Sequence, residues 1–260
     1  LLTPLNGSGP FPTVVQYYHC DGFLKGGVGD EIPMLPLIEH GIAILCLDRI
    51  YAPKSAGMGA SYERALDSIS EAIDGLAARR LIDPRRIGIG GLSFGSEVAL
   101  WAVRKSRRFA AATLSSGTLS SFYYWSNALP ARGFAEMLSD YWKIGDPDSD
   151  SLKWKTLSAA DDVSRLDTPL LLQLPESEMR TSIELHTRLK RAGKPVDLYV
   201  FADEPHIKYQ PRHKLAVYRR NLDWYRFWLK DQEDADPGKA VQYARWRAYR
   251  AGQSLPVPAP

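Results

Sequence analysis

The sequence predicts an α/β fold in which a mostly parallel central sheet is covered by helices on both faces. Short apolar runs alternate along the chain with amphipathic helical stretches, which is typical of this class. The 260 residues are enough for one substantial core, and the hydrophobic content of 45% and charged content of 24% are ordinary globular values. We therefore predict one domain over residues 1–260.

The first half of the chain contains three predicted strands and two predicted helices. A leading segment, residues 1–12, precedes strands at 13–18 (TVVQYY) and 42–47 (IAILCL). Apolar residues then recur at helical spacing between 65 and 76. The short run RRIGIGG (85–91) suits a central strand, and SEVALWAV (96–103) lacks Gly and Pro and favours helix.

In the second half of the chain, predicted strands and helices again alternate, with one long insertion between them. Strands are predicted at 109–116, 169–174 and 196–201, with helices over Ile183–Arg191 and Lys214–Leu229. Residues 118–165 form an aromatic-rich insertion, and such insertions at the carboxyl edge of a sheet usually shape a ligand pocket. The alternative is an excursion packed by its own aromatics. Residues 231–260 form a C-terminal extension with a proline-rich end.

The charge balance and the two cysteines give expectations about binding partners and cellular compartment. The net charge of +3 comes from 33 basic and 30 acidic residues interspersed along the chain, so we expect neither nucleic-acid nor membrane binding. Cys20 and Cys46 lie on separate segments, and Cys46 falls within an apolar run. We predict reduced thiols rather than a disulfide, which favours the cytoplasm. Because the chain does not begin with Met, we expect it to be a piece of a longer protein, with any targeting segment upstream.

The stretch GLSFGSE (91–97) contains the pattern Gly-x-Ser-x-Gly around Ser93. The pattern is common by chance, and it has physical meaning only where a buried strand turns sharply into a helix and exposes the serine hydroxyl. The flanking strand and helix predictions meet that condition. Ser93 is therefore our candidate nucleophile.

A serine nucleophile needs a base and a group that orients the base. His206 lies just after the predicted strand 196–201, whereas His213 is expected to open the last helix, and His19, His40 and His186 lie in the wrong order or element. The alternative for His206 is a surface histidine in an acidic loop. The acid should follow the strand 169–174, where Glu176 and Glu178 are both available; either could instead be a solvated glutamate at a helix start.

Four separated blocks of the sequence resemble the catalytic domain of the prolyl oligopeptidase family of serine peptidases. They are LIDPRRIGIGGLSFGSEVAL, TPLLLQLPESEMR, LKRAGKPVDLYVFADEPH and HKLAVYRRNLDWYRFWL. The resemblance runs from about residue 10 to residue 230. It implies an α/β-hydrolase fold, hydrolysis of a peptide or amide bond through an acyl-enzyme, and neither a metal nor a cofactor.

The resemblance also assigns residues. An ungapped match beginning at Thr168 places the family's aspartate on Glu178 and its substrate-binding arginine on Arg180, so Glu178 is preferred over Glu176. The family's oxyanion hole combines the N–H after the serine, here Phe94, with a tyrosine hydroxyl. Counting from two flanking segments gives Tyr18 or Cys20, and we choose Tyr18 because a thiol is a weak donor.

Two features resemble the lasso-peptide isopeptidases, a branch that cleaves the isopeptide bond closing a threaded peptide: the glutamate acid and the extension DQEDADPGKAVQYARWRAYR. We therefore expect a serine isopeptidase or peptidase. The alternatives are a general oligopeptidase or aminoacyl-releasing peptidase, a carboxylesterase, or an inactive binding module. The family implies an upstream β-propeller domain in the same protein. The sequence leaves open whether the protein forms a homo-oligomer. The expected pocket residues, each of which could instead be core or surface, are Phe122, Tyr123, Tyr124, Trp125 and, as a polar clamp, Arg180.

Overall fold

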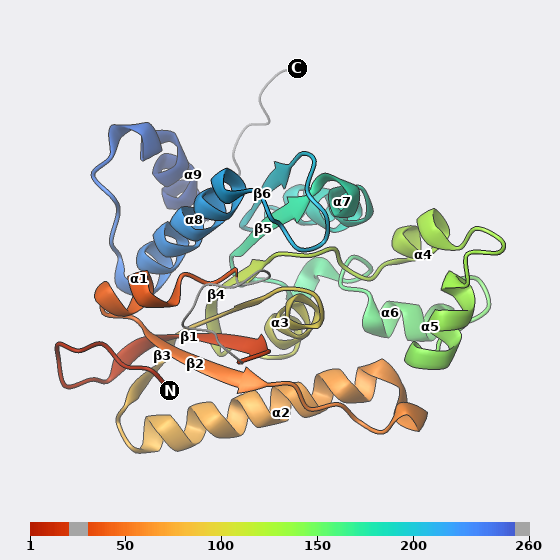
Figure 1. The fold of residues 1–260 in the computed structure, drawn as a ribbon, viewed down its shortest axis with the longest axis horizontal. Helices are drawn as coiled ribbons and strands as arrows, with labels where there is room; N and C mark the ends of the chain where they lie inside the picture. The colour runs from red at the N-terminus through yellow and green to blue at the C-terminus, as the bar shows by residue number, and fades with distance from the viewer. Residues whose placement is uncertain (21–30, 253–260) are drawn as a thin grey trace.

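A six-stranded sheet forms the centre of the computed structural model, which describes residues 1–20 and 31–252. The strand order is β2-β1-β3-β4-β5-β6, and every strand pairing is parallel (Figure 1). The α/β-hydrolase prediction is confirmed. The strands are β1 (Phe11–Tyr18), β2 (Ala43–Asp48), β3 (Ile82–Gly91), β4 (Phe109–Leu114), β5 (Leu170–Pro175) and β6 (Val196–Phe201).

Helices cover both faces of the sheet. One face carries α2, α3 and α7, and the other carries α1, α8 and α9, while α4, α5 and α6 gather beyond one end of the sheet (Figure 1). The helices are α1 (Met34–Glu39), α2 (Gly57–Ala78), α3 (Phe94–Lys105), α4 (Ser121–Asn127), α5 (Phe134–Trp142), α6 (Ser151–Leu157), α7 (Glu176–Arg191), α8 (Pro211–Lys230) and α9 (Ala240–Arg250). Short 3₁₀ turns cover Lys54–Ala56, Val163–Arg165 and Pro237–Lys239.

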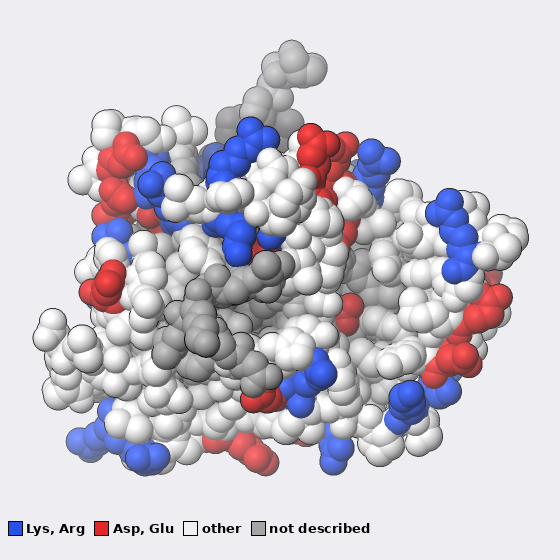
Figure 2. All heavy atoms as spheres, viewed as in Figure 1, with Lys and Arg blue, Asp and Glu red and all other residues white. Residues whose placement is uncertain are grey.

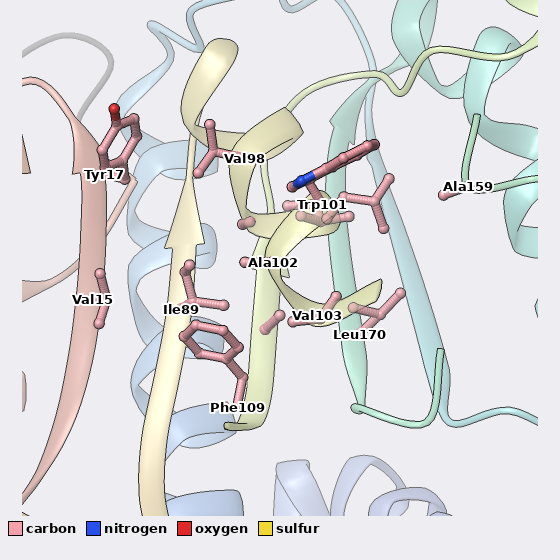
Figure 3. Close-up of a cluster of buried hydrophobic side chains, with 14 of the residues drawn as sticks. Val15, Tyr17, Ile89, Val98, Trp101, Ala102, Val103, Phe109, Ala159 and Leu170 are labelled. Atoms are coloured by element: carbon pink, nitrogen blue, oxygen red, sulfur yellow. The ribbon is translucent and has the colours of Figure 1, made fainter. Parts of the chain in front are cut away.

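The helix α3 is anchored in the largest apolar cluster. Its Val98, Ala102 and Val103 are buried against the sheet, where Ile89 of β3 is fully buried (Figure 3). Removing a Val or Ile side chain from water contributes about 1.5–3 kcal/mol, so burial of this face fixes the helix on β3. The turn that joins β3 to α3 is therefore held from both sides.

Two differences between the structure and the sequence prediction concern α7 and the C-terminal extension. The helix α7 begins at Glu176 rather than Ile183, which puts both candidate acids in its first turn. The C-terminal extension contains α9, which was not predicted; its Tyr243 and Trp246 pack on Phe227 of α8. Tyr243 and Trp246 are the buried residues of α9, and Tyr249 packs against the same cluster. Residues 253–260, the predicted proline-rich end, lie outside the described residues.

Cys20 and Cys46 form a disulfide, so the prediction of reduced, buried thiols is wrong. Their Cα atoms are 5.9 Å apart because β1 and β2 are parallel neighbours, with Gln16 in register with Cys46. The two segments look separate in the sequence, but the sheet brings their carboxyl ends together. Cys46 is only partly buried at that edge.

The insertion 118–165 forms a small unit, here called the cap, that contains α4, α5 and α6. It has its own apolar core, which comprises Leu119, Tyr124, Leu138, Ile144 and Trp154. On the face shown in Figure 2, acidic and basic side chains are interspersed. Within residues 1–20 and 31–252, no helix has the length and apolar character needed to cross a bilayer.

Candidate active site

Ser93 lies on the sharp turn between β3 and α3. Its backbone has φ 56° and ψ −130°, a strained conformation for a residue with a side chain. A Cβ added to Gly91 would lie 2.7 Å from the carbonyl carbon of Gly95, and one added to Gly95 would lie 2.4 Å from the Tyr17 oxygen. Only glycine fits at either position, which is the physical reason for the Gly-x-Ser-x-Gly spacing.

Glu178 and His206 are in direct contact. Glu178 stands in the first turn of α7, directly after β5, and its Oε1 lies 2.5 Å from Nδ1 of His206, which follows β6. Its other oxygen, Oε2, accepts a hydrogen bond from the Gly117 N–H at 2.7 Å. The hydrogen bond to Glu178 raises the pKa of His206 above its ordinary value of 6.5. With Nδ1 bound to Glu178, Nε2 is the ring nitrogen left for a reacting group.

The loop that carries His206 is held by buried charges on both sides of the histidine. The Glu204 carboxylate accepts hydrogen bonds from the N–H groups of Tyr209 at 2.9 Å and Gln210 at 3.2 Å. Lys208, whose side chain is fully buried, pairs with Glu31 at 3.4 Å. His213 lies in α8 and contacts Glu204, so it is engaged away from Ser93.

Ser93, Glu178 and His206 line one cavity of about 280 Å³. The carboxyl ends of β3, β5 and β6 point to the same edge of the sheet, which brings these three residues together from distant parts of the sequence. Within the described part of the chain, no hydrogen bond joins Ser93 Oγ to His206. Such contacts often form only when substrate is bound.

The alternative acid has a different environment. Glu176 is half exposed and pairs with Arg180 at 3.3 Å, one helical turn along α7. Arg180 is itself largely exposed and is not among the described residues that line the cavity. The structure therefore places Glu178 beside His206 and places Glu176 and Arg180 on the surface.

Phe94 and Tyr18, the candidate oxyanion donors, are neighbours. Phe94 is the first residue of α3, where backbone N–H groups have no acceptor within the helix. The Tyr18 ring packs edge-on against Phe94 with centroids 5.9 Å apart. Tyr18 also lies next to Tyr51, whose pKa is raised to about 12 by burial and by this neighbour. Cys20, the other residue considered, has no thiol to donate because of the disulfide.

The four aromatic residues expected in the pocket have three different environments. Tyr123 lines the cavity. Tyr124 is buried in the cap core, with its ring centroid 5.5 Å from that of Trp154. Phe122 and Trp125 are 46% and 52% exposed and are not among the described lining residues.

Several lining residues were missed by sequence reasoning. Glu97 is the most informative, because its Oε2 accepts a hydrogen bond from the Tyr62 hydroxyl at 2.9 Å and burial raises its pKa to about 7. Glu97 lies in the first turn of α3, four residues after Ser93, which is the N-cap of that helix, so the spacing could have suggested that both line one cavity. The other missed lining residues are Ser116, Gly117, Thr118, Leu119, Met137, Leu138, Trp142 and Thr181.

Comparison with known proteins identifies the family of this chain. The model of the prolyl oligopeptidase family matches residues 54–232. The lasso peptide isopeptidase AtxE2 of Asticcacaulis excentricus is 39% identical over 96% of this chain and 38% of its own length. The uncharacterized peptidase YuxL of Bacillus subtilis is 28% identical over 66% of this chain and 25% of its own length.

Solved structures are similar to this chain in the same way. The apo structure of the AtxE2 isopeptidase has a TM-score of 0.83 and 36% identity, covering 95% of this chain and 39% of that one. A serine-to-alanine variant with Astexin3-dC4 bound has a TM-score of 0.84. Acylaminoacyl peptidase of Pyrococcus horikoshii, at 20% identity and TM-score 0.69, covers 92% of this chain and 40% of that one and shares the fold. The chain belongs to the prolyl oligopeptidase family.

Proposed function

We propose that the chain hydrolyses an amide bond, with Ser93 as nucleophile, His206 as general base and Glu178 as the orienting acid. The observation that carries the proposal is the 2.5 Å contact between Glu178 and His206 beside the strained Ser93 turn, in one cavity. This is the arrangement of nucleophile, base and orienting group that acyl transfer requires.

The proposed chemistry has two steps. In the first, His206 Nε2 takes the Ser93 proton, Oγ bonds to the carbonyl carbon, and the imidazolium returns the proton to the leaving amine as the C–N bond breaks. In the second, water loses a proton to His206 and attacks the acyl carbon, the bond between that carbon and Ser93 Oγ breaks, and His206 returns the proton to Oγ. The Phe94 N–H and the Tyr18 hydroxyl are the proposed donors to the tetrahedral oxyanion.

We further propose that the bond is the isopeptide bond of a lasso peptide. Support comes from the 39% identity to AtxE2, which is named a lasso peptide isopeptidase, and from the solved AtxE2 variant with Astexin3-dC4 bound. This chain spans 38% of the length of that relative, so substrate choice and the upstream β-propeller are both proposals about the longer protein.

The test is mass spectrometry of a threaded lasso peptide and its linear counterpart after incubation with the full-length enzyme. We expect a gain of one water mass on the threaded peptide, its loss in Ser93→Ala, and unchanged cleavage in the control Ser106→Ala at the other end of α3. Cleavage of the linear peptide alone would replace the isopeptidase by a general oligopeptidase. No serine-dependent cleavage of either would contradict the proposal.

The cytoplasmic location predicted from reduced cysteines has lost its support, because Cys20 and Cys46 are bonded. Disulfides persist mainly in oxidising compartments. Alkylation of thiols in intact cells tests the location directly. Two alkylated cysteines would favour the cytoplasm, and none would favour an oxidising compartment.

A further inference from the structure

Glu97 presents a carboxylate to the cavity that the proposed mechanism does not use. It lies in the first turn of α3, and Ser93 is the N-cap of that helix. The Tyr62 hydroxyl from α2 donates to Glu97 Oε2 at 2.9 Å. Oε1 accepts no hydrogen bond from a described residue, so one carboxylate oxygen is available to a ligand in the cavity that Ser93 also lines.

Thr118 provides a second, independent polar group in the same wall. Its side chain is only 3% exposed, and its Oγ1 has no hydrogen-bond partner among the described residues. Thr118 and Glu97 together line both the main cavity and a smaller one of about 20 Å³. A buried hydroxyl without a partner is costly, and a ligand group that hydrogen-bonds to it removes that cost.

The groups that face Glu97 from the other elements do not neutralise it. The phenols of Tyr62 on α2 and Tyr123 on α4 are uncharged at neutral pH because burial raises their pKa values. Glu178 on α7 and His206 after β6 are bound to each other. Glu97 is therefore the carboxylate of this cavity that stands outside the catalytic set.

The basic residues nearby leave Glu97 without a cationic partner. Arg104 of α3 lines only the smaller cavity and donates to the carbonyls of Lys155 and Thr156. No Lys or Arg is among the described residues that line the main cavity. Burial raises the pKa of Glu97 to about 7, so the carboxylate is mostly ionised at about pH 8. An N–H group of a ligand would meet no cationic competitor there.

An isopeptide bond has a distinctive set of groups on the side of its carbonyl. The carbonyl comes from an acidic side chain, so methylene groups connect it to a backbone unit. That unit carries an N–H donor on one side of its Cα and a C=O acceptor on the other. In an ordinary peptide bond the carbonyl belongs to the backbone itself, and a side chain branches from the adjacent carbon.

We propose that Glu97 and Thr118 form a subsite for the backbone unit of the acidic residue whose side-chain carbonyl Ser93 attacks. Glu97 Oε1 accepts the N–H of that unit, and Thr118 Oγ1 donates to its C=O. The apolar side chain of Leu138 lines the same cavity and packs against the methylene groups. The subsite rests on the proposed function, because it names how the same site selects an isopeptide bond over an ordinary peptide bond.

The test compares two p-nitroanilides on the full-length enzyme. One is N-acetyl-aspartate methylamide with p-nitroaniline on its side-chain carbonyl, and the other has a CH2 group in place of the aspartate backbone N–H. A plain alkyl fluorophosphonate normalises each variant for the reactivity of Ser93. The variants are Glu97→Gln, which keeps an oxygen for Tyr62 and turns an NH2 group to the cavity, Thr118→Val, and the control Glu71→Gln, which is exposed on α2.

We expect kcat/KM for the N–H substrate to exceed that for the CH2 substrate at least about tenfold in the wild type and in Glu71→Gln, and the two to be about equal in Glu97→Gln. Thr118→Val should lower kcat/KM about threefold for both substrates, because both keep the C=O. The ratio should fall as pH drops from about 8 to about 6, because protonation removes the charge of Glu97, whereas protonation of His206 slows both substrates alike.

A ratio near one in the wild type would overturn the subsite, as would a ratio that stays high in Glu97→Gln or a Thr118→Val variant with wild-type rates. Release of nitroaniline from neither substrate, or only from the α-linked control N-acetyl-alanine p-nitroanilide, would also overturn it while the fluorophosphonate still modifies Ser93. Failure of the fluorophosphonate to modify Ser93 is a separate result: it would contradict the proposed function itself, and the subsite with it.

Discussion

The sheet edge and the cap contribute to the cavity in different ways. At the sheet edge, Ser93, Glu178 and His206 are held by strand ends, by hydrogen bonds from backbone N–H groups and by glycines that no other residue can replace. The cap contributes side chains from short helices that pack on their own small core. Position is thus determined by the backbone at the sheet edge and by side-chain packing in the cap.

This difference predicts different consequences of mutation. A change at the sheet edge should lower the rate of the chemical step or the stability of the fold, because it moves a reacting atom or a strand. A change in the cap should alter substrate binding and leave the chemistry in place.

Glu178→Gln should lower kcat/KM by about 10²- to 10⁴-fold, because His206 loses its orienting carboxylate. Glu176→Gln is the matched control two residues away, on the same turn but half exposed and paired with Arg180. It should change kcat/KM by less than about twofold, since exposed ion pairs contribute little. Steady-state kinetics on both variants gives the comparison. An equal loss in the two would contradict the assignment of the acid.

Gly95→Ala should destabilise the fold by about 1–3 kcal/mol, because the new Cβ would lie 2.4 Å from the Tyr17 oxygen and force β1 and α3 apart. Gly75→Ala is the control, since nothing lies within 4 Å of its added Cβ on α2. There the substitution should stabilise by about 0.5–1 kcal/mol. Urea denaturation measures both. A neutral Gly95→Ala would show that the close approach is not required.

In the cap, Tyr123→Ala should raise KM by about tenfold, because an aromatic wall of the cavity is removed. Phe122→Ala on the same helix should change KM by less than about twofold, since Phe122 is 46% exposed. In both variants kcat should stay near the wild-type value. A fall in kcat for Tyr123→Ala with KM unchanged would place this residue with the chemistry rather than with binding.

The smallest expected effect is a displacement of the pH profile. The hydrogen bond to Glu178 raises the pKa of His206, and the base must be neutral to act, so the acid limb of kcat/KM should lie above pH 6.5. In Glu178→Gln the limb of the residual activity should move to lower pH. A limb that stays in place in the variant would show that another group controls it.

The structure brings together the three residues predicted at the sheet edge, whereas of the four aromatics predicted in the cap Tyr123 lines the described cavity. Ser93, His206 and Glu178 each follow an apolar strand, and strands of this kind are recognisable from local composition. The Cys20–Cys46 bond was missed because it depends on which strands are neighbours, and strand order is not a local property.

The cap residues illustrate the same limit. Tyr123 and Tyr124 are adjacent in the sequence, yet one lines the cavity and the other fills the cap core. Composition alone cannot separate them, because the orientation of a seven-residue helix is decided by its partners, here Trp154 and Phe134. By contrast, Glu97 could have been predicted as a lining residue, because it follows Ser93 by four residues at the start of a predicted helix.

In the proposed mechanism, His206, oriented by Glu178, activates Ser93. The most direct test is the rate and site of modification by an alkyl fluorophosphonate, followed by peptide mass spectrometry, in the wild type and in His206→Ala. We predict modification of Ser93 that slows by about 10²- to 10⁴-fold in the variant. Modification of another residue, or an equal rate in the two proteins, would contradict the account.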